Sequence, residues 1–523
     1  MGAGGDAENI VVVRPNTWSP SIQAWKAHRE HQGYRIFEVE PGSTAEDTLD
    51  AIRNSCRSNS AMVHYVVLAA DAPAFIDRDN DRIPKEVIPT FYVDSKVVKN
   101  FGSEPTIASD YPYANLEQGG QHNAAVGRIP VHTKEELEAY LSKVISYETS
   151  ESFASWRREV DVVAGVGGFG AIADAVVEGV TRQLLSDDIP PEYRLSMTYA
   201  SPTSVYYPAP TCFSDVAVER MNDGGMFWVY LGHGYIDTLD FIPFENKLLS
   251  ILDRNSMHKV AIKCGPPIGI FLACYVGAFD AREPSMAEQL LLQPQGPVAM
   301  IAGSRVTMPY AMGILGSEML HECFQEKSTT IGKILFQAKK NAVRVNESLP
   351  NPSPDASVSR RDMLDSMAKA LSPEGHSIVD ERIEHNYLFN LLGDPTLQIR
   401  HPRPLSIQAP DETLAGADLV IRGQTPIAGR LVVELAYTRQ RIPEAAKQLR
   451  QDATQSDPLE KWQAVYQAAN RLTVCQIEKA TKGGEFEVKL PVDQACRGSY
   501  LIQATVYGDD DWSAGSRPIR VKR

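Results

Sequence analysis

The stretch IGIFLACYVGAFD, residues 268–280, is an apolar, strand-like segment that ends in a reactive side chain, Cys274. A second segment of this kind, WVYLGHGYID at residues 228–237, ends in His233. Short apolar runs bounded by glycine are typical of buried strands in a parallel sheet. Functional groups gather at the carboxyl ends of such strands. If the two strands are neighbours, an imidazole and a thiol lie over the same edge of the sheet.

A thiol beside an imidazole is the arrangement of a nucleophile and its base. The thiolate is the nucleophilic form of cysteine, and an adjacent histidine takes the proton of the thiol. The backbone N–H groups of Gly234 and Cys274 are candidates for an oxyanion hole. Gly232, Gly234 and Gly277 lack a Cβ atom, which would let a substrate backbone approach closely. The structural alternative stays open, because free cysteine is among the most buried residue types.

Strand-like and helix-like segments alternate on both sides of these motifs, from NIVVV to FNLLGDPTLQIR. The alternation predicts a parallel α/β sheet with helices on both faces. After Pro402 short β-rich segments separated by turn residues predict an all-β, immunoglobulin-like sandwich with a helical insertion at residues 443–472. We therefore expect three parts: an α/β subdomain at residues 1–150, a second α/β subdomain with His233 and Cys274 at residues 151–402, and the sandwich at residues 403–523.

A glycine loop, VVAGVGGFGAIAD at residues 162–174, carries the G-x-G-x-x-G pattern of dinucleotide-binding sites. Such a site also needs an acidic residue at the end of the next strand. That strand is RLSMTYA, and Asp187 and Asp188 lie before it, at the wrong end. A P-loop Lys-Ser/Thr pair is also missing. The pattern therefore favours a tight strand-to-helix turn, in which glycine adopts positive φ, over a dinucleotide enzyme.

Charge and cysteine content argue against several classes of protein. The net charge of -14 disfavours a nucleic-acid binder. The 7 cysteines form no CxxC pair, which argues against a disulfide framework or zinc knuckle and leaves at least one free thiol. No apolar run reaches the ~18 residues that a membrane helix needs. The first residues show no basic region followed by an apolar core, so no signal peptide is visible.

With these motifs the chain resembles the gingipain family of cysteine peptidases, in the caspase-like clan. In that clan the histidine sits in an H-G pair after one strand, and the cysteine ends the next strand as A-C or S-C. Here these are GHG at residues 232–234 and ACYVGAFD at residues 273–280. The resemblance covers about residues 9–400, and a trailing immunoglobulin-like domain is also usual there. Three more stretches are similar to those that flank gingipain-type domains: SDYPYANL, AAVGRIPVHTKEELEAYLSKVISYE and LLGDPTLQI.

The resemblance implies a caspase-like, gingipain-type fold in two subdomains and a cysteine endopeptidase that acts on polypeptides. His233 would be the base or ion-pair partner and Cys274 the nucleophile, while residues 1–150 would be non-catalytic. It implies no organic cofactor, and a secreted or cell-envelope location. The spacing between His233 and Cys274 is longer than in gingipains proper, and we expect the extra residues, near 247–267, to form a loop. A catalytically silent member that acts as a binding or cell-surface protein is the alternative.

Two residues predict opposite substrate preferences. When the chain is aligned with gingipains by the helix after the glycine loop, Asp174 falls at the base of the primary specificity pocket. There it would pair with a P1 Arg or Lys, and bidentate contact would favour Arg. Arg305 follows the strand after Cys274, where it would favour an acidic P1 residue or be a surface charge. The two side chains would alternatively pair with each other and leave the pocket neutral. We favour Asp174 and a basic P1 residue.

An acidic turn is the remaining candidate for a ligand site. Asp77, Asp79 and Asp81 have the spacing of a calcium loop. Arg82 replaces the glycine of the sharp turn, and Ile88 stands where the Glu ligand belongs. A solvated acidic turn is the favoured interpretation. Gingipain-like proteins bind calcium, so calcium stays a possible ligand by resemblance.

Overall fold

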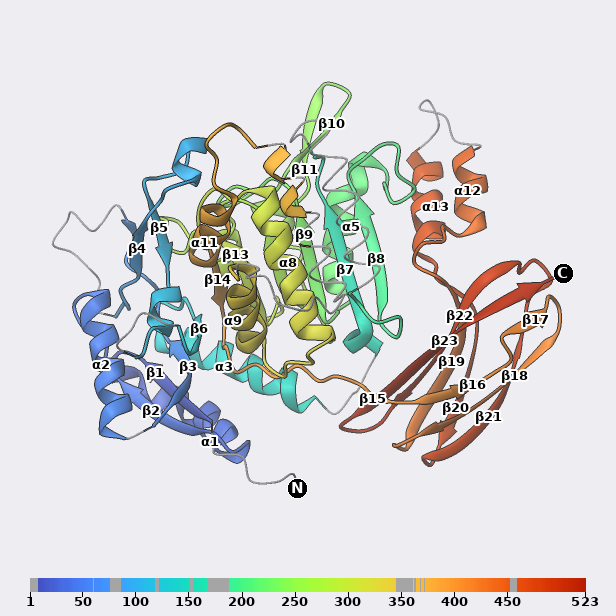
Figure 1. Cartoon of the computed structure of the whole chain (residues 1–523), viewed down its shortest axis with the longest axis horizontal. Helices are drawn as coiled ribbons and strands as arrows, with labels where there is room; N and C mark the ends of the chain where they lie inside the picture. The colour runs from blue at the N-terminus through green and yellow to red at the C-terminus, as the bar shows by residue number, and fades with distance from the viewer. Residues whose placement is uncertain are drawn as a thin grey trace, which may run out of the picture.

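A ten-stranded mixed sheet runs through the larger part of the molecule (Figure 1). The computed structural model describes residues 8–59, 61–75, 86–117, 122–150, 155–167, 188–344, 361, 364–366, 368–370, 372–451 and 459–523. In spatial order the strands are β2 (Arg35–Val39), β1 (Asn9–Val13), β3 (Val63–Leu68), β6 (Ala125–Arg128), β14 (Phe389–Leu392), β13 (Ala299–Gly303), β12 (Ile268–Leu272), β9 (Phe227–Leu231), β7 (Glu159–Ala164) and β8 (Arg194–Tyr199).

The sheet has two parallel halves that run in opposite directions. Neighbouring strands are parallel throughout, as the alternating pattern predicts, except that β14 is antiparallel to β13. The strands are apolar along their whole length at the centre, where β12 and β13 are fully buried, because helices cover both faces. β9 and β12 are parallel neighbours in this sheet, so their carboxyl ends share one edge.

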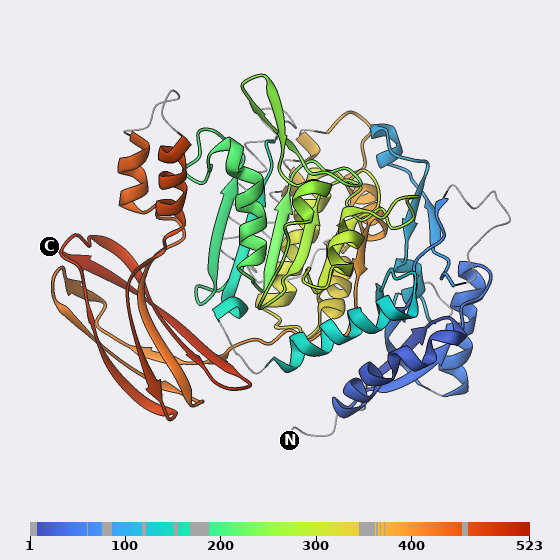
Figure 2. The same ribbon diagram turned by 180° about the vertical axis from the view of Figure 1, so that it is seen from behind.

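Helices flank the sheet on both faces: Figure 1 shows α8 and α9 in front of it, and Figure 2 shows α3 and α5 on the opposite side. Side-chain caps define several starts. Thr133 accepts the backbone N–H of Glu136 at the start of α3, and Ser285 and Glu288 form a capping box at the start of α7. The helices are α1 (Gln23–His31), α2 (Ala45–Ser58), α3 (Lys134–Thr149), α5 (Phe213–Asn222), α7 (Met286–Leu292), α8 (Pro309–Phe324), α9 (Ile331–Ala342) and α11 (Ile378–Leu388).

Buried ion pairs join the N-terminal half of the sheet to its centre. Arg29 in α1 pairs with Glu148 of α3 over 2.6 Å and with Asp394, just after β14, over 2.8 Å. Asp394 also accepts the backbone N–H of Thr396, which closes the turn in LGDPT. The three charged side chains are at most 1% exposed, and charges buried this deeply persist only when they are paired. The network therefore fixes α1 against the rest of the α/β part.

The loop expected near residues 247–267 is a hairpin followed by a short helix, which corrects the sequence interpretation. β10 (Phe241–Phe244) pairs antiparallel with β11 (Lys247–Ser250), and α6 (Arg254–Met257) follows. A two-residue turn joins the strands, and Glu245 adopts a left-handed φ of 52° there. The turn contains no glycine, so the sequence lacks the residue that usually indicates a hairpin turn. A further short antiparallel pair consists of β4 (Phe91–Asp94) and β5 (Thr106–Ser109).

The C-terminal part is a β domain of two packed sheets. One sheet has the order β15-β23-β22-β19-β20, with β17 also paired to β23, and the other has the order β16-β18-β21. Apolar side chains of both sheets, such as Val433 and Leu490, share one core. The strands are β15 (Arg403–Pro404), β16 (Ser406–Gln408), β17 (Glu412–Leu414), β18 (Asp418–Thr425), β19 (Gly429–Tyr437), β20 (Thr473–Thr481), β21 (Gly484–Pro491), β22 (Gly498–Tyr507) and β23 (Trp512–Lys522).

The β domain contacts the edge strand β8 of the large sheet. Glu434 of β19 forms a buried ion pair with Arg158 and a second ion pair with the partly exposed Arg194, which belongs to β8. Two helices lie between β19 and β20, α12 (Glu444–Gln451) and α13 (Leu459–Asn470). The side chain of Asn470 accepts the backbone N–H of Met197 and donates to its carbonyl, which pairs two backbone groups on the open edge of β8.

Among the residues that the structure describes, no helix has the length and apolar character needed to cross a membrane. No disulfide joins any of the seven cysteines, all of which lie in the described part of the chain.

Candidate active site

The pairing register of β9 and β12 brings His233 and Cys274 to the same edge of the sheet. The two strands are parallel neighbours, as predicted, and Leu231 pairs with Leu272 at their ends. His233 and Cys274 each follow two residues after this pair. Adjacent strands lie about 4.8 Å apart, so the two residues leave the sheet at neighbouring points of one edge. Both side chains are partly exposed, which leaves them accessible to a ligand.

The glycine loop orients the imidazole of His233. The Nε2 atom of His233 lies 2.9 Å from the backbone carbonyl oxygen of Gly167. A carbonyl only accepts hydrogen bonds, so Nε2 carries a proton and Nδ1 is the basic nitrogen of the neutral ring. Gly167 has a φ of +81°, as expected for a tight turn at this point. The first part of the glycine loop thus holds a histidine, and the rest of it, residues 168–174, lies outside the described residues.

A buried Tyr–Asp pair connects the His233 loop to the glycine loop. The Tyr230 hydroxyl donates to the backbone carbonyl of His233 over 2.9 Å and accepts the backbone N–H of Asp240 over 3.3 Å. The Asp240 carboxylate accepts the backbone N–H of Val166, in the glycine loop, over 2.9 Å. Burial raises the pKa of Tyr230 well above its usual value, so the hydroxyl keeps its proton. These contacts make the position of His233 depend on both loops.

The turn after β12 is strained, and it directs the sulfur of Cys274. Tyr275 adopts φ 60°, which is rare for a bulky residue and costs about 1–3 kcal/mol. Its backbone N–H donates to the carbonyl of Arg305 over 3.1 Å. The Cys274 sulfur accepts the backbone N–H of Thr307 over 3.3 Å and lies 3.5 Å from the Thr307 hydroxyl. The segment after β13 therefore supports both the strained turn and the sulfur atom.

The glycines beside the pair serve internal packing, which corrects the expectation that they make room for a substrate. A Cβ atom on Gly234 would lie 2.7 Å from the Cys274 carbonyl oxygen. On Gly277 it would lie 2.7 Å from the Cβ atom of Ala302, and on Gly232 it would lie 2.6 Å from the Tyr230 hydroxyl. All three positions are filled by protein atoms. Gly234 brings the histidine loop into contact with the cysteine turn.

Arg305 is buried, so the interpretation of this residue as a surface charge is wrong. Its guanidinium binds both carboxylate oxygens of Asp280, over 2.8 and 2.6 Å, and donates to the carbonyl of Thr106. The Arg305 side chain is 5% exposed and that of Asp280 is 1% exposed. The charge of Arg305 is therefore balanced inside the protein, which favours a structural role over selection of an acidic P1 residue. Glu104 also lies 3.5 Å from the guanidinium, whereas the expected alternative of pairing with Asp174 stays a prediction, because Asp174 lies outside the described residues.

Several predicted site residues lie outside the described residues. These are Asp174, the candidate specificity residue, and the possible calcium ligands Asp77, Asp79 and Asp81. Their roles stay predictions. Among the described residues, no group of three or more His, Cys, Asp or Glu side chains has the geometry to hold a metal ion.

Sequence reasoning missed Tyr230, Asp240 and Thr307. A tyrosine inside the apolar run WVYL is a weak signal for a buried hydroxyl with a partner. Asp240 lies seven positions after His233, and Thr307 lies on another strand connection, so nothing local marks either contact. Each becomes visible only when the loops at one edge of the sheet are placed together.

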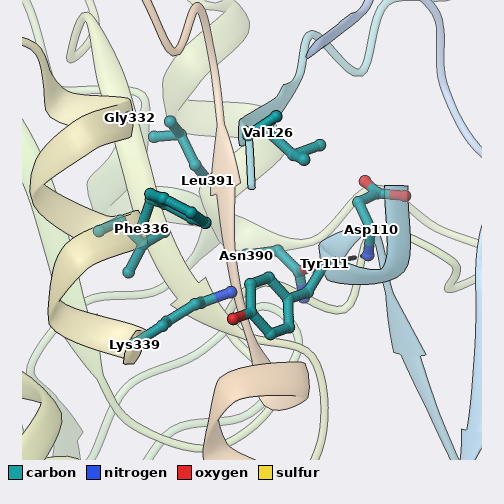
Figure 3. Close-up of a pocket in the computed structure, with 10 residues that line it drawn as sticks. Asp110, Tyr111, Val126, Gly332, Phe336, Lys339, Asn390 and Leu391 are labelled. Atoms are coloured by element: carbon teal, nitrogen blue, oxygen red, sulfur yellow. Dashed lines mark hydrogen bonds between the residues drawn. The ribbon is translucent and has the colours of Figure 1, made fainter. Parts of the chain in front are cut away.

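A small cavity lies elsewhere in the α/β part. It has a volume of about 20 Å³, room for about one water molecule. Lys339 of α9 points into it and lies 4.3 Å from the centre of the Tyr111 ring (Figure 3). Burial lowers the pKa of Lys339 to about 7. Asp110, Phe336 and Asn390 are also part of the lining, whereas His233 and Cys274 are not, so this cavity is separate from the candidate active site.

Comparison with protein families gives one match over most of the chain. The family model that matches residues 3–400 is described as peptidase family C25. No curated protein sequence matches the chain.

Comparison with solved structures gives matches that cover 98% or more of the chain. The structure of the Arg-specific cysteine proteinase gingipain R (RgpB) is 16% identical, with a TM-score of 0.51, over 100% of this chain and 99% of that chain. A complex of Porphyromonas gingivalis RgpB pro- and mature domains matches at 16% identity and a TM-score of 0.51, over 98% and 100% of the two chains. A structure described as a protease is 14% identical, with a TM-score of 0.55, over 99% and 98%. At these identities the matches establish the fold: an α/β caspase-like core followed by a β domain.

Proposed function

Since the chain belongs to peptidase family C25, a family of cysteine peptidases, we propose that it is an endopeptidase whose nucleophile is Cys274 and whose base is His233. One observation carries the proposal. Two paired strands end in register two residues before these side chains, and the imidazole is held by the Gly167 carbonyl so that Nδ1 is its basic nitrogen. The substrate class that follows is a polypeptide.

The acylation step uses each of these groups. Nδ1 of His233 takes the proton of the Cys274 thiol, and the sulfur attacks the carbonyl carbon of the scissile bond. A sulfur–carbon bond forms, and negative charge develops on the carbonyl oxygen. We assign the backbone N–H groups of Gly234 and Cys274 as the donors that stabilise this charge. The imidazolium then returns the proton to the leaving amine as the carbon–nitrogen bond breaks.

The deacylation step repeats this sequence with water. His233 takes a proton from a water molecule, whose oxygen attacks the thioester carbon. The sulfur–carbon bond breaks, the new carboxyl product leaves, and the proton on the imidazolium restores the thiol. The Nε2–H bond to Gly167 is kept in both protonation states of the ring, because Nε2 is a donor in each of them.

Substrate preference is assigned to the glycine loop. We propose that Asp174 pairs with a basic P1 side chain, on the basis of its place after a glycine loop of the gingipain type. The buried pairing of Arg305 with Asp280 supports this choice, because it removes the rival residue that favoured an acidic P1. Arg is expected to be preferred over Lys, since a guanidinium makes bidentate contact with a carboxylate.

The test of the activity is hydrolysis of a peptide library scanned at P1, by the wild type and by Cys274→Ala and His233→Ala. We expect Cys274→Ala to abolish turnover and His233→Ala to lower it by several orders of magnitude, because the two groups act as a unit. Cys264→Ala is a matched control, since Cys264 is an exposed thiol outside the candidate site. Undiminished hydrolysis by Cys274→Ala, in protein free of contaminating proteases, would overturn the assignment.

The rate at which Cys274 is alkylated tests the alternative that the protein is catalytically silent. If the protein only binds, iodoacetamide should alkylate Cys274 slowly at neutral pH, and His233→Ala should not change that rate. An activated thiol should instead react quickly and lose this reactivity in His233→Ala.

The P1 preference is tested with Asp174→Asn. Breaking a buried charge pair costs on the order of 2–5 kcal/mol, so cleavage after Arg should fall tens-fold or more. Cleavage after Asp that survives in Asp174→Asn and disappears in Arg305→Ala would show that Arg305 selects the substrate.

A further inference from the structure

Exposed apolar side chains gather on the segment that follows His233. Large hydrophobic side chains are exposed at twelve positions of the described part of the chain, and four of these lie between residues 235 and 248. The exposed fractions are 53% for Tyr235, 37% for Ile236, 36% for Phe241 and 68% for Leu248. Single exposed hydrophobic residues are normal, but a contiguous group marks an interaction surface.

The register of the β10–β11 hairpin places part of this group on one face. Phe241 pairs with Ser250, and Pro243 pairs with Leu248. Residues directly opposite each other in an antiparallel pair point to the same side, so Phe241, Pro243 and Leu248 share a face. Ile242, on the other face, is 2% exposed. The hairpin therefore packs one face against the protein and presents a second apolar face to solvent.

The exposed face is continuous with the candidate active site. Tyr235 follows His233 by two residues, and its ring lies 6.2 Å from the ring of Phe241. The backbone N–H of Tyr235 donates to Thr238 over 2.8 Å, which fixes this connection. Figure 1 shows the hairpin standing out from the molecule at the end of the sheet where β9 ends. We call Tyr235, Phe241, Pro243 and Leu248 the hairpin face.

The hairpin offers side chains rather than a free strand edge to a partner. Pro243 lies within β10 and has no backbone N–H, so an added strand would find a donor missing there. Proline on an edge strand is a device that prevents strand pairing with other chains. Recognition at this surface therefore depends on apolar contact.

We propose that the hairpin face is an exosite that binds apolar side chains of the polypeptide substrate near the bond to be cleaved. This proposal rests on the proposed function, since it deepens the substrate class of that same site. The occupant follows from position: a polypeptide that reaches Cys274 passes the loop of His233, and Tyr235 continues that loop into the hairpin face. A substrate with Leu or Phe beside the scissile bond covers this surface, and one with Gly or Ser does not.

The test compares Leu248→Ser with Leu414→Ser. Leu414 lies in β17 of the β domain and is 56% exposed, so it is a matched control away from the site. Two decapeptides share one cleavage residue and differ only in flanking positions, Leu and Phe in one and Gly and Ser in the other. A short reporter with a fluorescent leaving group has no flanking residues. Because Leu248 is 68% exposed, its replacement should leave the fold intact, which a melting curve checks.

We expect Leu248→Ser to raise KM for the apolar decapeptide about five- to tenfold, the effect of losing part of one buried hydrophobic contact. kcat for that peptide, and both constants for the polar peptide and the short reporter, should stay at wild-type values. The Leu414→Ser control should match the wild type throughout. Equal KM values for the apolar peptide in both variants would overturn the exosite.

A binding measurement distinguishes failure of the exosite proposal from failure of the proposed function. Anisotropy of the labelled apolar decapeptide on Cys274→Ala measures affinity without turnover, and adding Leu248→Ser should weaken it by the same factor. If the wild type cleaves no peptide, the proposed function fails, whatever the binding result. If it cleaves and Leu248→Ser binds as tightly, only the exosite fails. A concentration-dependent dimer in sedimentation that Leu248→Ser dissolves would also overturn the exosite, because a second copy would then cover the hairpin face.

Discussion

The backbone N–H of Thr307 donates to the sulfur of Cys274 over 3.3 Å, and the Thr307 hydroxyl lies 3.5 Å from the same atom. Thr307 belongs to the connection after β13, and Cys274 to the turn after β12. The two meet because these strands are parallel neighbours that end at one edge of the sheet. The contact places hydrogen-bond donors at the atom where negative charge develops when the thiol loses its proton.

Thr307→Val should slow the reaction of Cys274. The variant keeps the shape of the side chain and the backbone donor but loses the hydroxyl, and one hydrogen bond is worth about 0.5–1.5 kcal/mol. We expect a two- to tenfold lower rate of alkylation by iodoacetamide and a similar loss in kcat/KM for a peptide. Thr307→Ser retains the hydroxyl and should behave as the wild type. Equal alkylation rates in the two variants would show that the hydroxyl plays no part.

Arg305→Met should destabilise the fold without changing substrate preference. The substitution leaves the Asp280 carboxylate buried without its partner, which costs about 3–5 kcal/mol. The double variant Arg305→Met, Asp280→Leu removes both charges and should recover most of the loss, as measured by urea unfolding. A single variant of wild-type stability with an altered P1 preference would instead place Arg305 in contact with the substrate.

Stability should fall in acid partly because of His385. Its Nε2 accepts the backbone N–H of Met308, its Nδ1 donates to the carbonyl of Glu381, and burial lowers its pKa to about 4. An unfolded histidine titrates near 6.5, so below that pH the unfolded chain binds a proton that the folded chain does not. This site should therefore remove up to about 3 kcal/mol as the pH falls from 6.5 to 4.

The measurement is the melting temperature of the wild type and of His385→Gln between pH 4 and 7. The wild-type curve should be the steeper of the two, because the variant has no proton to bind at this position. His258→Gln is the control, since His258 is an exposed residue next to α6. Parallel curves for the wild type and His385→Gln would contradict the prediction.

Lys339 should produce a second pH dependence, at higher pH. Burial lowers its pKa to about 7, whereas an unfolded lysine titrates near 10.4, so the unfolded chain holds more protons between these values. Stability should rise with pH across this window, and the penalty should be largest below pH 7. Lys339→Met should be more stable than the wild type at neutral pH and should show a shallower rise between pH 7 and 10 in thermal melts. Lys340→Met is the control, since Lys340 is an exposed neighbour, and its stability should depend on pH as that of the wild type does. A slope of stability against pH that is unchanged in Lys339→Met would refute the assignment of this pH dependence to Lys339.

Local patterns of residues were sufficient to predict several features of the fold. The apolar runs before His233 and Cys274 predict two buried strands, and these are β9 and β12. The alternation before Pro402 predicts the α/β sheet, and the short β segments after it predict the two-sheet β domain. These features follow from the periodicity of side-chain burial along a few residues, which the order of apolar and polar residues encodes.

The residues that support the two reactive side chains are set by tertiary contacts, which local patterns do not predict. The carbonyl of Gly167 receives His233 across 66 positions of sequence, Tyr230 and Asp240 join the two loops, and Thr307 reaches the sulfur across 33 positions. A surface charge was one expectation for Arg305 from its sequence context, but its buried partner Asp280 lies 25 positions away. The antiparallel step at β14 and the hairpin after His233 were also unforeseen. Contacts of this kind arise when separate strand connections meet at one sheet edge, and no local pattern of hydrophobicity encodes which backbone group will face which side chain.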